Sequence, residues 1–180
     1  MKKFSVVLAA VLFIAGMAII AYAEHERIIP YESTFGHYET MPMVGAGDLR
    51  HYITSHRPYK TDKEFALWPG KGKQYKGTEP HGSLLTTYVN ERALKSIKSG
   101  KGMANNSIII KENYAPNKKL VAITVMYKVK GYNPEGGNWY WAKYDTEFNP
   151  LADGKVKGCL TCHGTVKDND YVFTGKVTGK

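Results

Sequence analysis

The sequence is poor in cysteine: Cys159 and Cys162 are the only two in 180 residues, so no other thiol competes for a group that they bind. The chain has no internal repeats and no low-complexity tract, which excludes repeat architectures. Its formal net charge is +9, but the lysines are scattered. No strip of basic and aromatic side chains is typical of a nucleic-acid-binding surface, so we expect no nucleic-acid partner.

The longest apolar run is confined to the N-terminus. Residues 1–23 begin with Lys2 and Lys3, continue through an apolar stretch at 6–20 and end in Ala21-Tyr22-Ala23. A basic start, an apolar middle and a small-x-small end are the pattern of a cleaved secretory signal peptide. An uncleaved anchor is the alternative, although the run is shorter than the roughly 20 residues that a spanning helix needs. The sequence therefore predicts export to the periplasm and no membrane attachment after cleavage.

The most informative motif is Cys159-Leu160-Thr161-Cys162-His163, which has the C-x-x-C-H spacing of a c-type haem attachment site. Each thiol can form a thioether to one haem vinyl group, and the histidine is placed to bind the iron. A zinc knuckle would need two more ligands nearby, and no other histidine pair lies close to the cysteines. A thioredoxin-like dithiol stays open, although no βαβ unit is visible. We predict one covalent haem c, bound by Cys159 and Cys162, with His163 as proximal iron ligand.

The rest of the chain divides into an extended arm at 24–46 and a single haem domain at 47–180. Capping residues and apolar spacing predict helices at 47–56, with Asp48 as N-cap, at 62–67, and from Asn90 to 98, closed by Gly100. β-Branched and aromatic runs predict strands at 83–89, 106–113, 120–130 and 138–145. Short turns between these strands favour an antiparallel meander. The expected fold class is therefore α+β, an antiparallel sheet of four to five strands with short helices.

The haem motif follows the strands, near the C-terminus, whereas small electron-transfer cytochromes are mainly helical and carry it near the N-terminus. We therefore expect the haem to pack against the sheet, with the last segment folding over its other side. The order of several short motifs resembles that of the cytochrome P-460 family, whose fold is shared by the β-type of cytochrome c′. The matching motifs, between about residues 47 and 173, are Pro80-His81-Gly82, Tyr88-Val89-Asn90, Ile110-Lys111-Glu112, Met126-Tyr127-Lys128, Gly137-Asn138-Trp139, Cys159–His163 and Asp170–Thr174.

The resemblance gives Lys111 a specific expectation. In the hydroxylamine-oxidising members, a lysine on the strand after the short helix is bonded covalently to the haem ring, and Lys111 has the matching position. Side-chain alternation independently puts Lys111 on the face of Ile109 and Glu112 on the other face. The alternative is a lysine that has reached the sheet edge and extends into water.

One feature departs from the family pattern. The hydroxylamine-oxidising members carry a distal carboxylate on the following strand, but residues 113–134 contain no Asp or Glu, and Thr124 or a neighbour fills the place. Such a carboxylate would accept a proton from substrate. Glu112, Glu135 or His81 would substitute only if the fold brings one of them over the haem.

Three functions stay open at this point. The first is a haem oxidoreductase acting on hydroxylamine and nitric oxide, and the second is a protein that only binds nitric oxide. For both, the resemblance implies an open or water-occupied sixth position on the iron. The third is an electron carrier with Met126 or a histidine as sixth ligand, although core packing is our preferred interpretation of Met126. The resemblance also implies a homodimer, and the basic charge favours an acidic redox partner.

Overall fold

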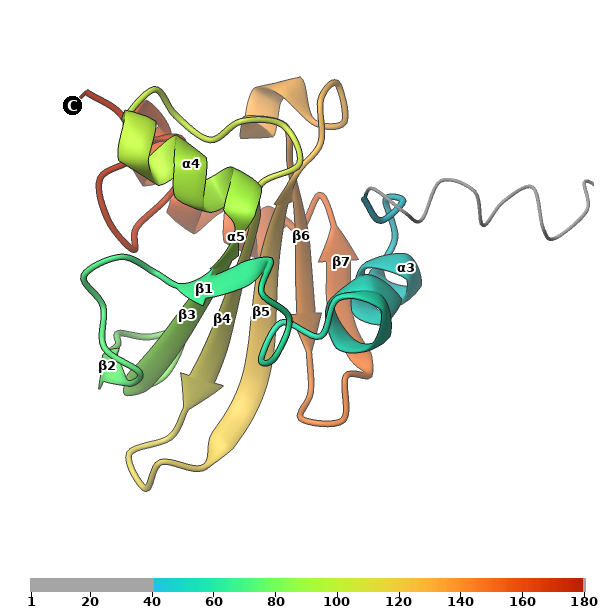
Figure 1. Ribbon diagram of the computed structural model, residues 1–180, viewed down its shortest axis with the longest axis vertical. Coiled ribbons are helices and arrows are strands. Elements are labelled where there is room, and N and C mark those ends of the chain that lie inside the picture. Colours follow the sequence, from blue (N-terminus) through green and yellow to red (C-terminus); the bar gives the residue numbers. More distant parts are fainter. Residues whose placement is uncertain (1–40, 180) are drawn as a thin grey trace, which may run out of the picture. The chain divides into compact units, whose positions relative to one another are not determined.

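The computed structural model describes residues 41–179 (Figure 1). The expected signal peptide and most of the expected arm lie outside the described residues, so these assignments stay predictions. Within the described range, no helix is both long enough and apolar enough to span a bilayer.

One antiparallel sheet of seven strands dominates the fold, which confirms the α+β class. The strands run in the order β1-β3-β4-β5-β6-β7, and β2 also pairs with β3. β4 and β5 are rich in β-branched residues, which favour the pleated backbone, and a tight turn at 115–119 joins them. The strand bounds are β1 Phe65–Leu67, β2 Tyr75–Lys76, β3 Leu84–Asn90, β4 Ile108–Tyr114, β5 Leu120–Lys128, β6 Trp139–Tyr144 and β7 Pro150–Gly154.

Short helices flank this sheet. The best-specified is α4, Glu91–Ser99: the Asn90 side chain accepts a hydrogen bond from the Ala93 amide at 3.0 Å, and Gly100 ends the helix in the left-handed conformation, φ 66°. The predicted caps of this helix are therefore confirmed. The other helical elements are α3 Ala46–His51, the π-helix η1 Tyr52–His56, the 3₁₀-helix η2 Pro134–Gly136, α5 Lys157–His163 and the 3₁₀-helix η3 Gly164–Asn169.

Two local expectations need correction, and strand β7 was not predicted. The N-cap of α3 is Gly45, and Asp48 lies in the first turn of the helix instead. Residues 62–67 do not form a helix, because Phe65–Leu67 pair with β3 as an edge strand. β7 had no strand signal, since it begins with Pro150, ends with Gly154 and contains no residue classed as buried.

The alternation predicted for β4 is confirmed and divides the sheet into two faces. Ile108, Ile110 and Glu112 point to the side covered by α3 and η1, which we call the α3 face. Ile109, Lys111 and Asn113 point to the other side, which α4 and α5 partly cover and which we call the pocket face. The two faces carry separate apolar clusters.

Candidate functional site

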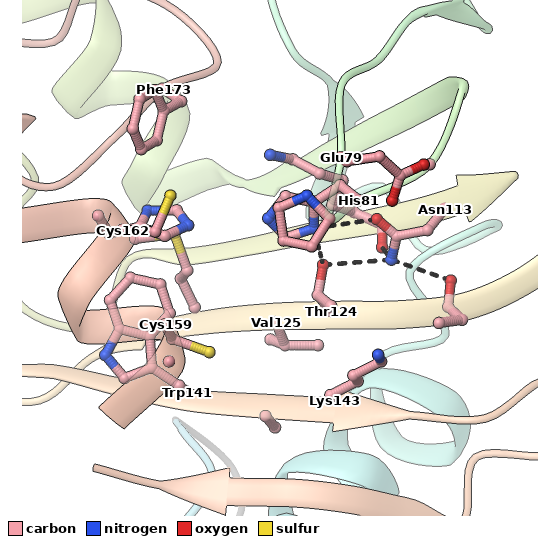
Figure 2. A pocket seen from close by; sticks show the side chains of 18 of the residues that line it. Glu79, His81, Asn113, Thr124, Val125, Trp141, Lys143, Cys159, Cys162 and Phe173 are labelled. Carbon is pink, nitrogen blue, oxygen red and sulfur yellow. Dashed lines mark hydrogen bonds between the residues drawn. The ribbon is translucent and has the colours of Figure 1, made fainter. Parts of the chain in front are cut away.

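A cavity of about 650 Å³ lies on the pocket face (Figure 2). Its walls come from β4, β5 and β6, the loop at 79–83, helix α5 and the segment at 172–174. The volume is in the range of pockets that enclose small ligands and cofactors. Cys159, Cys162 and His163, the residues predicted to hold the haem, line this cavity, and the sheet forms one wall of it.

His163 ends α5 and is buried, with 6% of its surface exposed. Its Nδ1 donates a hydrogen bond to the backbone carbonyl of Tyr171 at 2.6 Å, which leaves Nε2 as the unprotonated nitrogen that binds a metal. The rings of Trp141 and Phe173 pack against it, with centroid distances of 4.5 and 5.2 Å. Burial lowers the pKa of His163, which disfavours the protonated ring.

The two thiols precede His163 on the same short helix. Cys159 is half-buried, Cys162 is exposed, neither forms a disulfide, and both line the cavity. Burial raises the pKa of the Cys159 thiol. Among residues 41–179 there is no cluster of three or more His, Cys, Asp or Glu side chains suited to a metal ion, so a zinc knuckle lacks its ligands. Two free thiols and one free imidazole nitrogen on a largely apolar cavity fit a c-type haem.

Lys111 reaches the same cavity from β4. It lies on a central strand and is only 8% exposed, which disagrees with a lysine that extends into water from a sheet edge. Burial lowers its pKa to about 8, an effect that the nearby Cys162 partly offsets. In the described part of the chain, no carboxylate forms an ion pair with its amine.

A polar group lies beside Lys111 in the cavity (Figure 2). His81 Nδ1 donates to the side-chain oxygen of Asn113 at 3.1 Å and lies 3.4 Å from Thr124 Oγ1. Asn113 is buried, and its Nδ2 donates to the Ala122 carbonyl, which fixes its amide orientation. Burial, followed by the positive charge of Lys111, lowers the pKa of His81 to about 4. His81 therefore presents a neutral ring to the cavity.

The other residues considered as a distal base do not reach this cavity. Glu112 lies on the α3 face and Glu135 is exposed in η2. Met126 lines the cavity but packs with Ile109 and the tryptophans of β6 in the apolar cluster. Sequence reasoning missed Asn113 and Glu79, both of which line the cavity. The alternation of β4 could have found Asn113, which is two residues after Lys111 on the same face.

The sequence model of the family described as Cytochrome P460 matches residues 63–174. The matched range contains Lys111 and the α5 residues Cys159, Cys162 and His163. It also contains His81 and its neighbours Asn113 and Thr124. No curated protein matches the chain.

Proposed function

The chain belongs to the cytochrome P460 family of haem cytochromes, and from this membership we propose that it is a periplasmic cytochrome with one covalent haem that binds and oxidises hydroxylamine and nitric oxide. The observation that carries the proposal is the convergence of α5 and Lys111 on one cavity of about 650 Å³. Cys159 and Cys162 would hold the haem through thioethers, and His163 would bind the iron through Nε2.

The buried amine of Lys111 supports a role in chemistry. A pKa of about 8 leaves a sizeable uncharged fraction near neutral pH, and only the uncharged amine is nucleophilic. A lysine buried without a carboxylate partner costs stability, which is typical of functional sites. We therefore propose that the Lys111 nitrogen bonds to a carbon at the edge of the macrocycle, as the family resemblance implies; one N–H and one C–H bond are lost, and a peroxide as external oxidant takes up the two electrons and two protons.

The remaining cavity residues would orient substrate and exclude water. When bound, haem supplies an iron that takes up one electron at a time and coordinates a small ligand. Val125, Met126 and Trp141 form an apolar wall on β5 and β6, which keeps the dielectric low around that ligand. Thr124 supplies a hydroxyl next to His81.

Covalent attachment is tested on the purified protein after acid–acetone extraction. Haem should stay with the denatured polypeptide, and the pair Cys159→Ser and Cys162→Ser should release it. Haem that extracts from the unchanged protein, or zinc bound at one ion per chain, contradicts the proposal.

The Lys111 bond is tested by proteolysis and mass spectrometry. We expect one haem-bearing species that joins the Lys111 peptide to the Cys159–His163 peptide. Lys111→Ala should give two separate peptides, an ordinary haem c spectrum and no hydroxylamine oxidation. Lys143→Ala is the matched control, because Lys143 lines the same cavity from β6 but is exposed; it should keep the joined species.

A second function, nitric oxide binding without turnover, is favoured by one observation. Thr124 is the residue opposite Lys111 in the β4–β5 register, and neither strand places a carboxylate on the pocket face. Hydroxylamine added to the ferric protein separates the two functions. Reduction of the haem together with consumption of hydroxylamine supports the oxidoreductase, whereas a nitric oxide complex without hydroxylamine consumption supports the binding protein.

We also propose that the protein passes electrons to an acidic partner and forms a homodimer. The net charge of +9 supports the first point, because a basic surface accelerates encounter with an acidic one. The electron-transfer rate should then fall as ionic strength rises. Sedimentation of the mature protein tests the second.

A further inference from the structure

Two histidines that line the cavity, His81 and His163, lie close together although 82 residues of sequence separate them. The ring centroids of His81 and His163 are 6.1 Å apart and their planes are nearly perpendicular, at 87°. Each ring is fixed through Nδ1, His163 by the Tyr171 carbonyl and His81 by the Asn113 side chain. Among residues 41–179, neither ring therefore has a hydrogen-bond partner at Nε2.

The separation of the two rings matches a shared metal. A metal–imidazole bond is about 2 Å long, and each nitrogen lies about 1 Å from its ring centre, so two trans imidazoles have centroids about 6 Å apart. A base that acts on a ligand already bound to the iron would need a larger separation. The observed 6.1 Å therefore fits direct ligation by both rings.

The loop that carries His81 is built to hold this position. Gly82 has φ 98°, and a Cβ there would lie 2.8 Å from the Tyr114 carbonyl oxygen, so only glycine allows this approach to β4. The Ser83 amide donates to the same carbonyl at 3.0 Å. In Figure 2 the hydrogen-bonded edge of the His81 ring lies on the side of Asn113 and Thr124. The opposite edge faces the part of the cavity where Cys162 lies.

We propose that His81 is the sixth ligand of the haem iron in the resting protein, trans to His163, and that a small ligand must displace it. This inference rests on the haem part of the proposed function. It replaces the open sixth position that the family resemblance implies. Ligand binding would then depend on the dissociation of His81, because only the fraction of protein with His81 dissociated accepts a ligand.

The test compares optical and EPR spectra of the haem-loaded mature protein and its variants. The unchanged ferric protein should be six-coordinate and low-spin, with the strongly anisotropic EPR signal of perpendicular axial rings. His81→Ala should be high-spin, and added imidazole should restore the low-spin spectrum. Its ferrous form should bind nitric oxide roughly tenfold faster or more. His51→Ala, which removes an exposed histidine on α3, is the matched control and should behave as the unchanged protein.

The opposite results are equally specific. A high-spin ferric spectrum in the unchanged protein overturns the inference, and so does a low-spin spectrum that is lost in Met126→Ala or Lys111→Met instead. If His81→Ala does not retain haem, pulsed EPR of the unchanged protein decides the matter by detecting nitrogen couplings from two axial imidazoles or from one. Extractable haem defeats the proposed function, whereas a covalent high-spin haem defeats only His81 ligation.

Discussion

The two faces of β4 differ in how a buried charged side chain is compensated by its neighbours. On the α3 face, the carboxylate of Glu112 is 2% exposed and accepts hydrogen bonds from Tyr59 at 2.8 Å and Tyr114 at 2.6 Å, while Lys60 pairs with it at 2.7 Å. On the pocket face, the preceding residue of the chain, Lys111, has no carboxylate partner within the described range. The first charge is part of a hydrogen-bonded network that stabilises the fold, and the second is the buried amine for which we propose a role in chemistry.

The largest loss of stability is expected when the charges of Lys111 and Glu112 are exchanged. The double variant Lys111→Glu and Glu112→Lys keeps composition and net charge but leaves an unmatched ion on each face. We expect a loss of about 4 kcal/mol or more in the free energy of unfolding, measured by urea titration. The matched control exchanges Glu91 and Lys95, an exposed ion pair on α4, and should change stability by less than about 0.5 kcal/mol.

Removing the carboxylate alone isolates the α3 face. Glu112→Ala leaves the buried Tyr59 hydroxyl and that of Tyr114 without their acceptor, so we expect a loss of about 3 kcal/mol in unfolding free energy. Lys60→Ala removes the exposed partner and should cost less than about 1 kcal/mol. The haem spectrum should be the same in both variants. A spectral change in Glu112→Ala would show that the two faces are not independent.

Removing the amine isolates the pocket face through its pH dependence. Because the folded pKa of Lys111 is about 8 and the ordinary value is 10.5, the folded state binds the proton less well than the unfolded state. The resulting penalty is full below pH 8, falls as pH rises to 10.5 and vanishes above it. Lys111→Met should therefore be more stable by about 2 kcal/mol at pH 7, and the difference should shrink towards pH 10.5.

This measurement uses a Cys159→Ser, Cys162→Ser background, so that no haem is attached and the amine is free. Urea titrations at several pH values give the difference directly. A difference that does not vary between pH 7 and 10.5 would mean that the amine is solvated and that the pocket face carries no charge penalty.

A smaller loss of stability tests how the hydrogen bonds to Glu112 on the α3 face are divided among their donors. Tyr114 is half-buried, and its hydroxyl is one of three donors to Glu112, so Tyr114→Phe should cost about 1 kcal/mol. Burial and the hydrogen bond to Glu112 raise the pKa of Tyr114 to about 12. A cost near that of Glu112→Ala would show that the network depends on this one donor.

The sequence predicted those parts of the fold that local chemistry specifies. The caps of α4, Asn90 and Gly100, act within one turn, and the side-chain period of two along β4 separated Lys111 from Glu112. The edge strands β1, β2 and β7 were not predicted, because they are two to five residues long and form through pairing with β3 or β6. Local propensity gives no signal for such strands.

For the site as well, the sequence predicted the residues that lie within one short segment. The C-x-x-C-H spacing identified the α5 residues, since all three lie within one helical turn and a half. His81 was recognised only as a residue that the fold had to bring over the haem. Its contacts with Asn113 and with His163 span 32 and 82 residues of sequence. No periodicity or spacing in a single sequence reports contacts at that range.

The place of α5 in the chain has a consequence for biogenesis. β4, β5 and β6 are consecutive in sequence and pair as a meander, so each needs only its neighbour in order to form. Segments with such local contacts fold quickly, and N-terminal parts fold first as a chain emerges from its channel. The cysteines come at 159 and 162, after the last strand of the sheet. Under the proposed thioether attachment, the haem would therefore meet a chain in which β4, β5 and β6 are already paired, and Cys159, Cys162 and His163 would be among the last cavity-lining residues to be added.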